Sequence, residues 1–148
     1  MSVNFILRLN KVNLETTYIA GGCYWGLESL IIQIKGIQET VVGFSGGHID
    51  DVSYNDVSSG NTGHAETIMI KFDQDQLSFE KLLLEFFKLH NPTTPNQQGN
   101  DIGTQYRSSI FYTSNSQKAI AENVIQRVDA VSYTHLRAHE TLMNLVCR

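Results

Sequence analysis

The fold of this 148-residue chain is constrained most by the order in which segments with strand-like and helix-like patterns follow one another. Four short stretches rich in β-branched and aromatic residues are typical of strands, and they lie at residues 16–20, 39–45, 65–72 and 107–113. Three stretches with apolar residues at helical spacing separate or follow them, so the order is strand, helix, strand, strand, helix, strand, helix. The first six segments predict an α+β, ferredoxin-like (split βαβ) two-layer sandwich, with an antiparallel sheet and the helices on one face.

The predicted helices each present one apolar face. The first ends near Gly36, and its apolar positions are Leu27, Leu30, Ile31 and Ile34. Ser78 is expected to cap the second, whose apolar face is Phe79, Leu82, Leu83, Phe86 and His90. The third covers residues 116–128. Two polar loops, one running to Gly63 and one over residues 92–105, are long for a compact domain, and such loops are more often functional than idle.

Composition and charge argue against a nucleic-acid or membrane partner. The net charge is −4 and the pI is near 5.7, which disfavours binding to anionic surfaces. No apolar stretch approaches the roughly 20 residues of a membrane span, and the apolar run near the N-terminus is too short for a secretion signal. Two cysteines, Cys23 and Cys147, do not make a disulfide framework. We therefore expect a monomer in the reducing cytoplasm, where Cys23 stays a free thiol.

The segment AGGCYWGLESL, residues 20–30, places Cys23 between the end of a strand and the start of a helix. Backbone N–H groups and the helix dipole favour an anion at such a position, and the thiolate is the reactive form of cysteine. The alternative is a small buried side chain without chemistry, as most free cysteines are. Tyr24 and Trp25 could likewise only cover the core. Together with the two glycines, they favour a thiol in an aromatic pocket that receives a small apolar group.

Glu66 is the second informative residue. In AETIMIKF, residues 65–72, it shares one face of the strand with Ile68, Ile70 and Phe72. Burial on this apolar face is expected to raise the pKa of the Glu66 carboxyl group and so to make it a general acid near neutral pH. The alternative is a frayed strand end at which Glu66 is solvated.

The two loops contain further polar residues, none distinctive by itself. The polar and titratable members are His48, Asp50, Asp51, Tyr54, His64, Asp101 and Tyr106. Neither loop has a phosphate-binding glycine pattern at a strand-to-helix turn, which argues against a nucleotide site. His135 and His139 have the i, i+4 spacing of zinc ligands, but no third ligand accompanies them. We therefore expect neither a metal site nor a cofactor.

Four segments resemble the signature segments of the A-type peptide-methionine sulfoxide reductases, in the family's order and spacing. They are GGCYWGLE, GFSGG, SGNTGHAE and GNDIGTQYRSSIFYT, and the resemblance covers roughly residues 16–128. It implies thiol-dependent reduction of the S epimer of methionine sulfoxide, free or in proteins, to methionine. It also implies recycling by thioredoxin or a similar dithiol, without a cofactor.

The resemblance implies that Cys23 is the nucleophile and Glu66 the acid that protonates the sulfoxide oxygen. Tyr24 and Trp25 fall on the aromatics that hold the substrate's S-methyl group. A sulfoxide sulfur is a poor electrophile until its oxygen is protonated or strongly hydrogen-bonded, so the chemistry needs both the thiol and the acid. Cys23 would leave the reaction as a sulfenic acid, which a second thiol converts to a disulfide.

The resemblance assigns three loop residues to the same pocket. Tyr54 and Tyr106 fall on the hydroxyls that hydrogen-bond the sulfoxide oxygen. Asp101 falls on a supporting polar residue beside them. These roles are implied by the family pattern alone.

The sequence after residue 131 departs from the family pattern. The family continues with further segments that often carry a resolving cysteine, whereas this chain reads SYTHLRAHETLMNLVCR. That string resembles a translated sequencing-adapter read. The hypothesis is therefore a C-terminally incomplete catalytic domain at residues 1–131 and an atypical, artefactual tail at residues 132–148. For this reason Cys147 is not assigned as a resolving cysteine.

Two other functions stay open on the sequence alone. The chain could be a truncated, non-catalytic fragment of the same family that folds poorly or only binds oxidised methionine. It could also be another thiol redox enzyme, such as a peroxidase. The paired aromatics and the absence of a basic residue beside Cys23 argue against a peroxidase, because peroxide reduction needs no cage for a methyl group.

Overall fold

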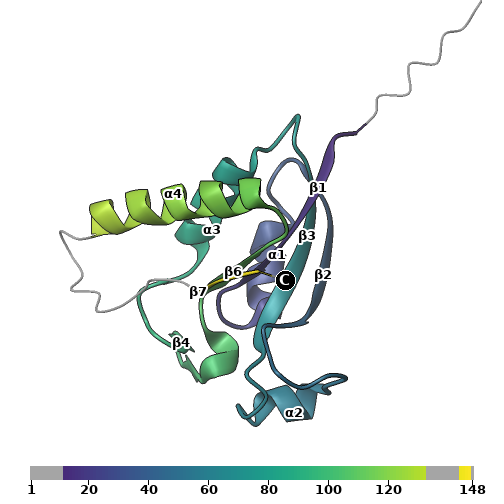
Figure 1. Cartoon of the computed structure of the whole chain (residues 1–148), viewed down its shortest axis with the longest axis vertical. Coiled ribbons are helices and arrows are strands. Elements are labelled where there is room, and N and C mark those ends of the chain that lie inside the picture. Colours follow the sequence, from purple (N-terminus) through teal and green to yellow (C-terminus); the bar gives the residue numbers. More distant parts are fainter. Residues whose placement is uncertain (1–11, 133–143, 148) are drawn as a thin grey trace, which may run out of the picture.

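The computed structural model describes residues 12–132 and 144–147, and its core is a two-layer α+β sandwich (Figure 1). The strands are β1 (Leu14–Ala20), β2 (Ile37–Ser45), β3 (Ala65–Asp73), β4 (Gln97–Gln98), β5 (Asp101–Ile102), β6 (Ser109–Tyr112) and β7 (Asn144–Cys147). The main sheet has the order β2-β3-β1-β6-β7, and β4 and β5 form a separate hairpin. The pairs β2–β3, β3–β1 and β1–β6 are antiparallel, as the split βαβ fold predicts.

Three helices cover one face of this sheet, as predicted (Figure 1). The helices are α1 (Tyr24–Ile31), α2 (Tyr54–Ser58), α3 (Phe79–Leu89) and α4 (Asn115–Ser132), with a short 3₁₀ turn η1 (Thr104–Tyr106) before β6. Side chains of α1, α3 and α4 pack into a single core with β1, β3 and β6. The short helix α2 and the β4–β5 hairpin lie at the end of the sheet where β1 stops.

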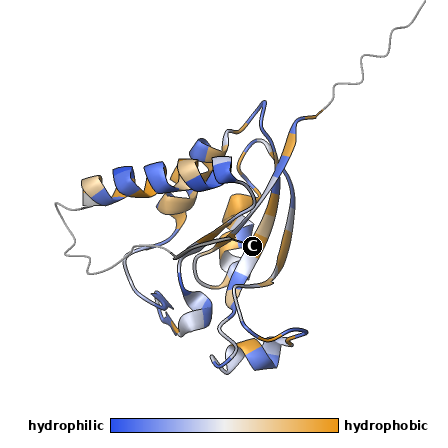
Figure 2. Cartoon of the chain, in the orientation of Figure 1, coloured by the Kyte–Doolittle hydropathy of each residue, from blue (hydrophilic) through white to orange (hydrophobic). Residues whose placement is uncertain are grey.

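Strand β3 shows how alternation builds the core. Ile68, Ile70 and Phe72 point to the helical layer and are fully buried. Burying each of these side chains contributes about 1.5–3 kcal/mol. In Figure 2 the hydrophobic colour runs along the strands and α1, while α4 is mostly hydrophilic on its outer face. The period of two also fixes the orientation of Glu66, which precedes this run on the same face.

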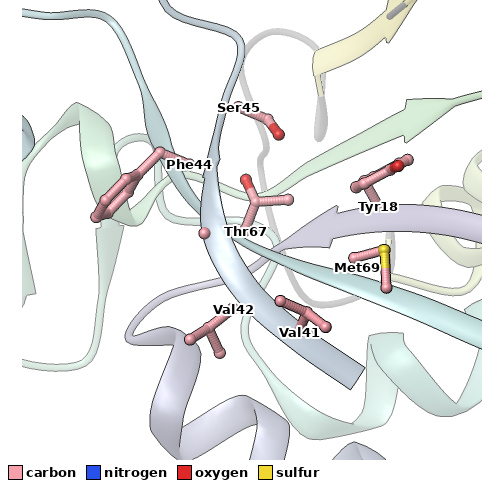
Figure 3. Close-up of a pocket in the computed structure, with 8 residues that line it drawn as sticks. Tyr18, Val41, Val42, Phe44, Ser45, Thr67 and Met69 are labelled. Atoms are coloured by element: carbon pink, nitrogen blue, oxygen red, sulfur yellow. The ribbon is translucent and has the colours of Figure 1, made fainter. Parts of the chain in front are cut away.

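The opposite face of the sheet carries a pocket, and no helix from the described part of the chain covers it. Its lining includes Tyr18, Val41, Thr67 and Met69 from three adjacent strands. Figure 3 shows Tyr18, Thr67 and Met69 on one side of β2 and Phe44 on the other. The side chain of Phe44 therefore belongs to the helical layer, which is where the candidate site lies.

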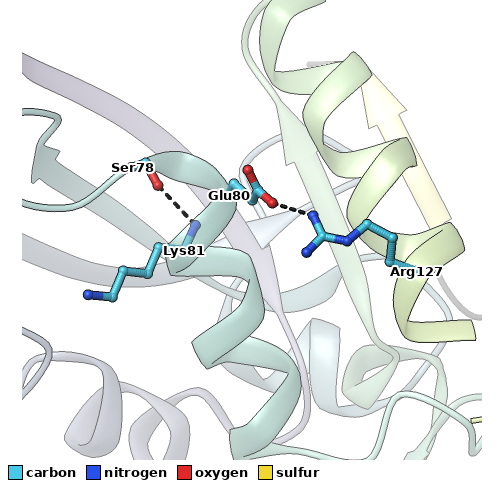
Figure 4. A network of polar contacts seen from close by, with 4 residues as sticks. All are labelled: Ser78, Glu80, Lys81 and Arg127. Carbon is cyan, nitrogen blue, oxygen red and sulfur yellow. Dashed lines mark hydrogen bonds and ion pairs between the residues drawn. The ribbon is translucent and has the colours of Figure 1, made fainter. Parts of the chain in front are cut away.

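Helix α3 begins at the predicted cap. The Ser78 hydroxyl accepts a hydrogen bond from the Lys81 N–H at 3.2 Å (Figure 4). This satisfies one of the N–H groups that have no partner within a helix. On the outer surface an ion pair joins Glu80 to Arg127 of α4 (Figure 4). Both side chains are about half exposed, so the pair contributes at most about 1 kcal/mol.

The structure corrects several predicted boundaries. Helix α1 begins at Tyr24 and ends at Ile31, so Ile34 lies beyond it and Leu30 faces solvent. His90 follows α3 instead of belonging to it. The polar loops contain α2, the β4–β5 hairpin and η1, none of which the periodicity predicted. Each of these elements is too short to show a period.

Part of the predicted tail lies outside the described residues. Residues 133–143 and 148 belong to that part, and so do His135 and His139. Strand β7 comes from the same segment and pairs in parallel with β6. Among the residues that the structure describes, no helix has the length and apolarity needed to span a membrane.

Candidate active site

Cys23 lies at the turn between β1 and α1 and is exposed. It is the N-cap residue of α1, and its carbonyl accepts the first helical hydrogen bond from the Leu27 N–H at 3.1 Å. Its side chain makes no capping bond. Gly22 turns the chain with φ +101°, a conformation that L residues rarely adopt. The sequence thus places a free thiol at the start of a helix, as predicted.

Glu66 is buried beside this turn. Only 4% of its surface is exposed, so the frayed-end alternative is wrong. The Tyr24 N–H donates to its Oε2 at 3.0 Å, which puts the carboxyl group one peptide unit from Cys23. Burial raises the pKa of Glu66, the charge of Asp101 raises it further, and the Tyr24 N–H opposes them. The carboxyl group is therefore disposed to hold a proton next to the thiol.

Aromatic rings form a row beside the thiol and the acid. The Tyr24 ring centroid is 5.7 Å from that of Trp25 and 5.8 Å from that of Phe44, and Phe44 is 6.5 Å from Tyr54. These separations are typical of interacting aromatic pairs. Tyr24 is buried, whereas 66% of Trp25 is exposed. The row therefore ends in an exposed indole at Trp25, two residues after Cys23.

Tyr106 brings the second polar loop to the same place. Burial raises the pKa of its phenol, and the nearby Glu66, Tyr54, Asp101 and Cys23 raise it further. The same neighbourhood acts on Tyr24, whose pKa is raised by burial first and then by Glu66 and Tyr54. Raised phenol pKa values keep both hydroxyls protonated and able to donate.

All seven residues predicted for the site therefore lie together. Cys23, Tyr24 and Trp25 come from the start of α1, Tyr54 from the start of α2, and Glu66 from β3. Asp101 and Tyr106 come from β5 and η1 and act electrostatically on Glu66 or Tyr24. The structure thus brings together the residues that the sequence assigned to one site. The individual roles assigned to them stay predictions.

Two further side chains support the turn that carries Cys23. Gln98 of β4 lies against Gly22, where an added Cβ would come within 2.6 Å of its Cγ. His90 lies against Gly21, and its imidazole bonds the Phe86 carbonyl at 2.8 Å and the Ser108 hydroxyl at 2.7 Å. Burial lowers the pKa of His90 to about 4, so the imidazole is neutral near pH 7.

Sequence reasoning did not single out these supports or Phe44. The position of Phe44 could have been inferred from the sequence, because strand alternation places it opposite Glu66 on the helical face of the sheet. Gln98 and His90 carry no local signal for their role, since both act on a turn more than 65 residues away in sequence. Among the described residues, no three His, Cys, Asp or Glu side chains gather as metal ligands.

The fold and the site define the class of protein. An exposed thiol, a buried carboxyl group that favours its protonated form and two phenol hydroxyls can pass a proton to a substrate oxygen while sulfur attacks its neighbour. This is the equipment of a thiol-dependent oxidoreductase on a ferredoxin-like sandwich.

Comparisons with known proteins identify the family. The family model for peptide methionine sulfoxide reductase matches residues 15–142. The peptide methionine sulfoxide reductase MsrA of Ruthia magnifica is 44% identical over 115 residues, covering 78% of this chain and 71% of that protein. MsrA of Acinetobacter baumannii strain AYE is 45% identical over 113 residues, covering 76% of this chain and 65% of that protein.

Solved structures agree with this assignment. Methionine sulfoxide reductase A of Corynebacterium diphtheriae has a TM-score of 0.84 at 32% identity, covering 90% of this chain and 65% of that one. Reduced Mxr1 of Saccharomyces cerevisiae has a TM-score of 0.78 at 27% identity, covering 91% of this chain and 76% of that one. The chain belongs to the peptide methionine sulfoxide reductase family. It spans about two thirds of the length of most of these relatives.

Proposed function

We propose that this chain reduces methionine S-sulfoxide to methionine, with Cys23 as the nucleophile. The observation that carries the proposal is the hydrogen bond from the Tyr24 N–H to Glu66, because it holds a buried carboxyl group beside an exposed thiol. Membership in the family supplies the substrate, which the site alone does not name.

In this mechanism Glu66 and the two tyrosines act on the oxygen while Cys23 acts on the sulfur. Glu66 protonates the sulfoxide oxygen, and Tyr54 and Tyr106 donate hydrogen bonds to it. The Cys23 thiolate attacks the sulfur once the S–O bond is polarised. Tyr24 and Trp25 hold the S-methyl group, and Asp101 supports Glu66 in its protonated form, because its negative charge raises the pKa of Glu66.

In the net step the substrate sulfur loses its oxygen and the Cys23 sulfur gains one. Attack forms a bond between the Cys23 sulfur and the substrate sulfur, and the protonated oxygen leaves the substrate as hydroxide. A hydroxide or water oxygen then bonds to the Cys23 sulfur, the sulfur–sulfur bond breaks and methionine is released. Two electrons pass from Cys23 to the substrate, so Cys23 becomes a sulfenic acid. An external thiol condenses with it to a mixed disulfide with loss of water, and a second thiol restores Cys23 by exchange.

The recycling partner in this proposal is a thioredoxin-type dithiol. Yeast Mxr1 has been solved in complex with Trx2, a structure whose 20% identity to this chain shows likeness of fold alone. A reducing compartment such as the cytoplasm suits the mechanism, because Cys23 must return to the thiol after each turnover. The proposal includes a monomer that acts on free or protein-bound methionine sulfoxide.

The test is methionine release from racemic methionine sulfoxide with dithiothreitol as the reductant. Dithiothreitol reduces a sulfenic acid directly, so the assay needs no resolving cysteine. We expect about half of the racemate to be consumed, because an asymmetric site binds one epimer productively. Consumption of both epimers would contradict the assigned selectivity.

The matched control is Cys23→Ser. The variant should keep the circular dichroism spectrum of the wild type and lose turnover, because a serine hydroxyl is too weak a nucleophile without an activating base. A folded wild-type chain that releases no methionine would refute the proposed function. Turnover by Cys23→Ser would refute the assigned nucleophile.

A further inference from the structure

The two tyrosines predicted to contact the sulfoxide oxygen come from different loops. Tyr54 lies in the connection between β2 and β3, residues 46–64, and Tyr106 lies in η1, which precedes β6. Tyr54 is 52% exposed, so packing of its own side chain does not fix its loop. Contacts between the two loops are therefore needed to fix the position of the Tyr54 hydroxyl relative to the Tyr106 hydroxyl.

Arg107, next to Tyr106, bridges these two loops. Its Nη2 donates to the Gly63 carbonyl at 3.0 Å, and its Nη1 donates to the Thr104 carbonyl at 2.8 Å. A Cβ added at Gly46 would lie 3.0 Å from the same Nη2. One guanidinium therefore contacts both ends of the 46–64 connection and the start of η1. Burial lowers the pKa of the Arg107 guanidinium, and its two hydrogen-bond acceptors here are neutral carbonyls.

Two neighbouring side chains extend the bridge. Gln105 is buried, and its Nε2 donates to the carbonyl of Ser58, the last residue of α2, at 3.4 Å. The Thr104 hydroxyl donates to the Gly60 carbonyl at 3.4 Å. The three side chains around Tyr106 thus donate hydrogen bonds to three carbonyls in the second half of the loop that carries Tyr54. We call Thr104, Gln105 and Arg107 the loop clamp.

We propose that Arg107 is a positioning residue that orients the hydroxyls of Tyr54 and Tyr106 toward the same substrate oxygen. The inference rests on the proposed function, because the two hydroxyls matter only if they act on that oxygen. The rigid fork of the guanidinium suits the role, since it bonds two carbonyls at a fixed angle. A lysine at this position keeps the charge but offers one ammonium group, which cannot reproduce both bonds.

The test is a double-mutant cycle on kcat/KM with Arg107→Lys and Tyr54→Phe. If Arg107 positions both hydroxyls, Arg107→Lys lowers kcat/KM about tenfold with Tyr54 present and by a smaller factor, about threefold, in the Tyr54→Phe background, where only Tyr106 remains to be positioned. Arg127→Lys is the matched control and should leave kcat/KM unchanged, because its partner Glu80 lies on the outer surface. Equal losses from Arg107→Lys in both backgrounds would overturn the proposal.

Amide hydrogen exchange tests the clamp without any substrate. Arg107→Lys should speed exchange across residues 46–64 and leave α3 unchanged, and unchanged exchange in the loop would overturn the clamp. If the wild type shows no turnover, the proposed function is refuted. The hydrogen-exchange result then still tests whether Arg107 holds the two loops together. If Arg107→Lys does not fold, Gln105→Met gives a second cycle, because it removes only the bond to Ser58.

Discussion

At the scale of single residues, Glu66 is the side chain whose environment is most consequential. Burial outweighs the Tyr24 N–H, so the folded protein binds the Glu66 proton more tightly than the unfolded chain does. The resulting stability is fully present below the unfolded pKa of about 4.5 and is lost as the pH rises through the raised folded pKa. Wild type should therefore lose stability relative to Glu66→Gln between pH 4 and neutral pH, since glutamine mimics the protonated acid. Urea denaturation across this pH range measures the difference.

Glu28→Gln is the control for this experiment. Glu28 is a half-buried residue of α1, so Glu28→Gln controls for the replacement of a carboxylate by an amide away from the buried core. A constant difference between wild type and Glu66→Gln at all pH values would mean that the acid is not desolvated in solution.

The same variant tests the chemical role of Glu66. Glu66→Gln keeps an acceptor for the Tyr24 N–H but cannot donate a proton, so kcat/KM should fall on the order of 100-fold or more. The wild-type rate should also decrease as the pH rises through the raised pKa of Glu66, and the variant should lack this decrease. A variant within twofold of wild type would remove Glu66 from the mechanism.

At the scale of elements, Gly22 in the turn before α1 and Gly26 within α1 should respond in opposite ways to replacement by alanine. Gly22→Ala combines φ +101° with a clash against Gln98, so it should cost about 1–3 kcal/mol from backbone strain and should also lower turnover by displacing Cys23. Gly26→Ala, in α1, meets nothing within 4 Å and should stabilise the protein by about 0.5–1 kcal/mol. Thermal unfolding of both variants measures the contrast. Destabilisation by Gly26→Ala equal to that by Gly22→Ala would show that the helix, and not the turn, is the sensitive part.

Some features of these elements could be predicted from the sequence, and others could not. The alternation in β3 predicted which face holds Glu66, and the change from strand to helix periodicity predicted that Cys23 lies at the start of a helix. The clamp by Arg107 was not predictable, because its acceptor at Gly63 lies 44 residues away and becomes a neighbour only after the sheet forms. The helix α2 did leave a signal, since Ser53 and Asp56 form a capping box.

At the scale of the whole molecule, the sheet register separates the two cysteines. Ala20 pairs with Ser109, and Ser109 pairs with Asn144, so β7 starts level with the end of β1 and runs away from it. The backbone of Cys147 lies three residues further along, about 10 Å, and two strand spacings aside, again about 10 Å. Cys23 continues beyond Ala20 in the opposite sense. A disulfide requires Cα atoms within about 7 Å, so β7 would have to leave the sheet to form one.

This separation predicts the outcome of a single turnover without added reductant. One equivalent of methionine S-sulfoxide should consume one of the two thiols and leave Cys147 free, because Cys23 stops at the sulfenic acid. Thiol titration, with trapping of the sulfenic acid and mass spectrometry, measures this directly. Turnover of Cys147→Ser with dithiothreitol should equal that of the wild type, since the reductant acts on Cys23 itself. Loss of both thiols as a Cys23–Cys147 disulfide would show instead that β7 detaches during catalysis and that Cys147 serves as the resolving cysteine.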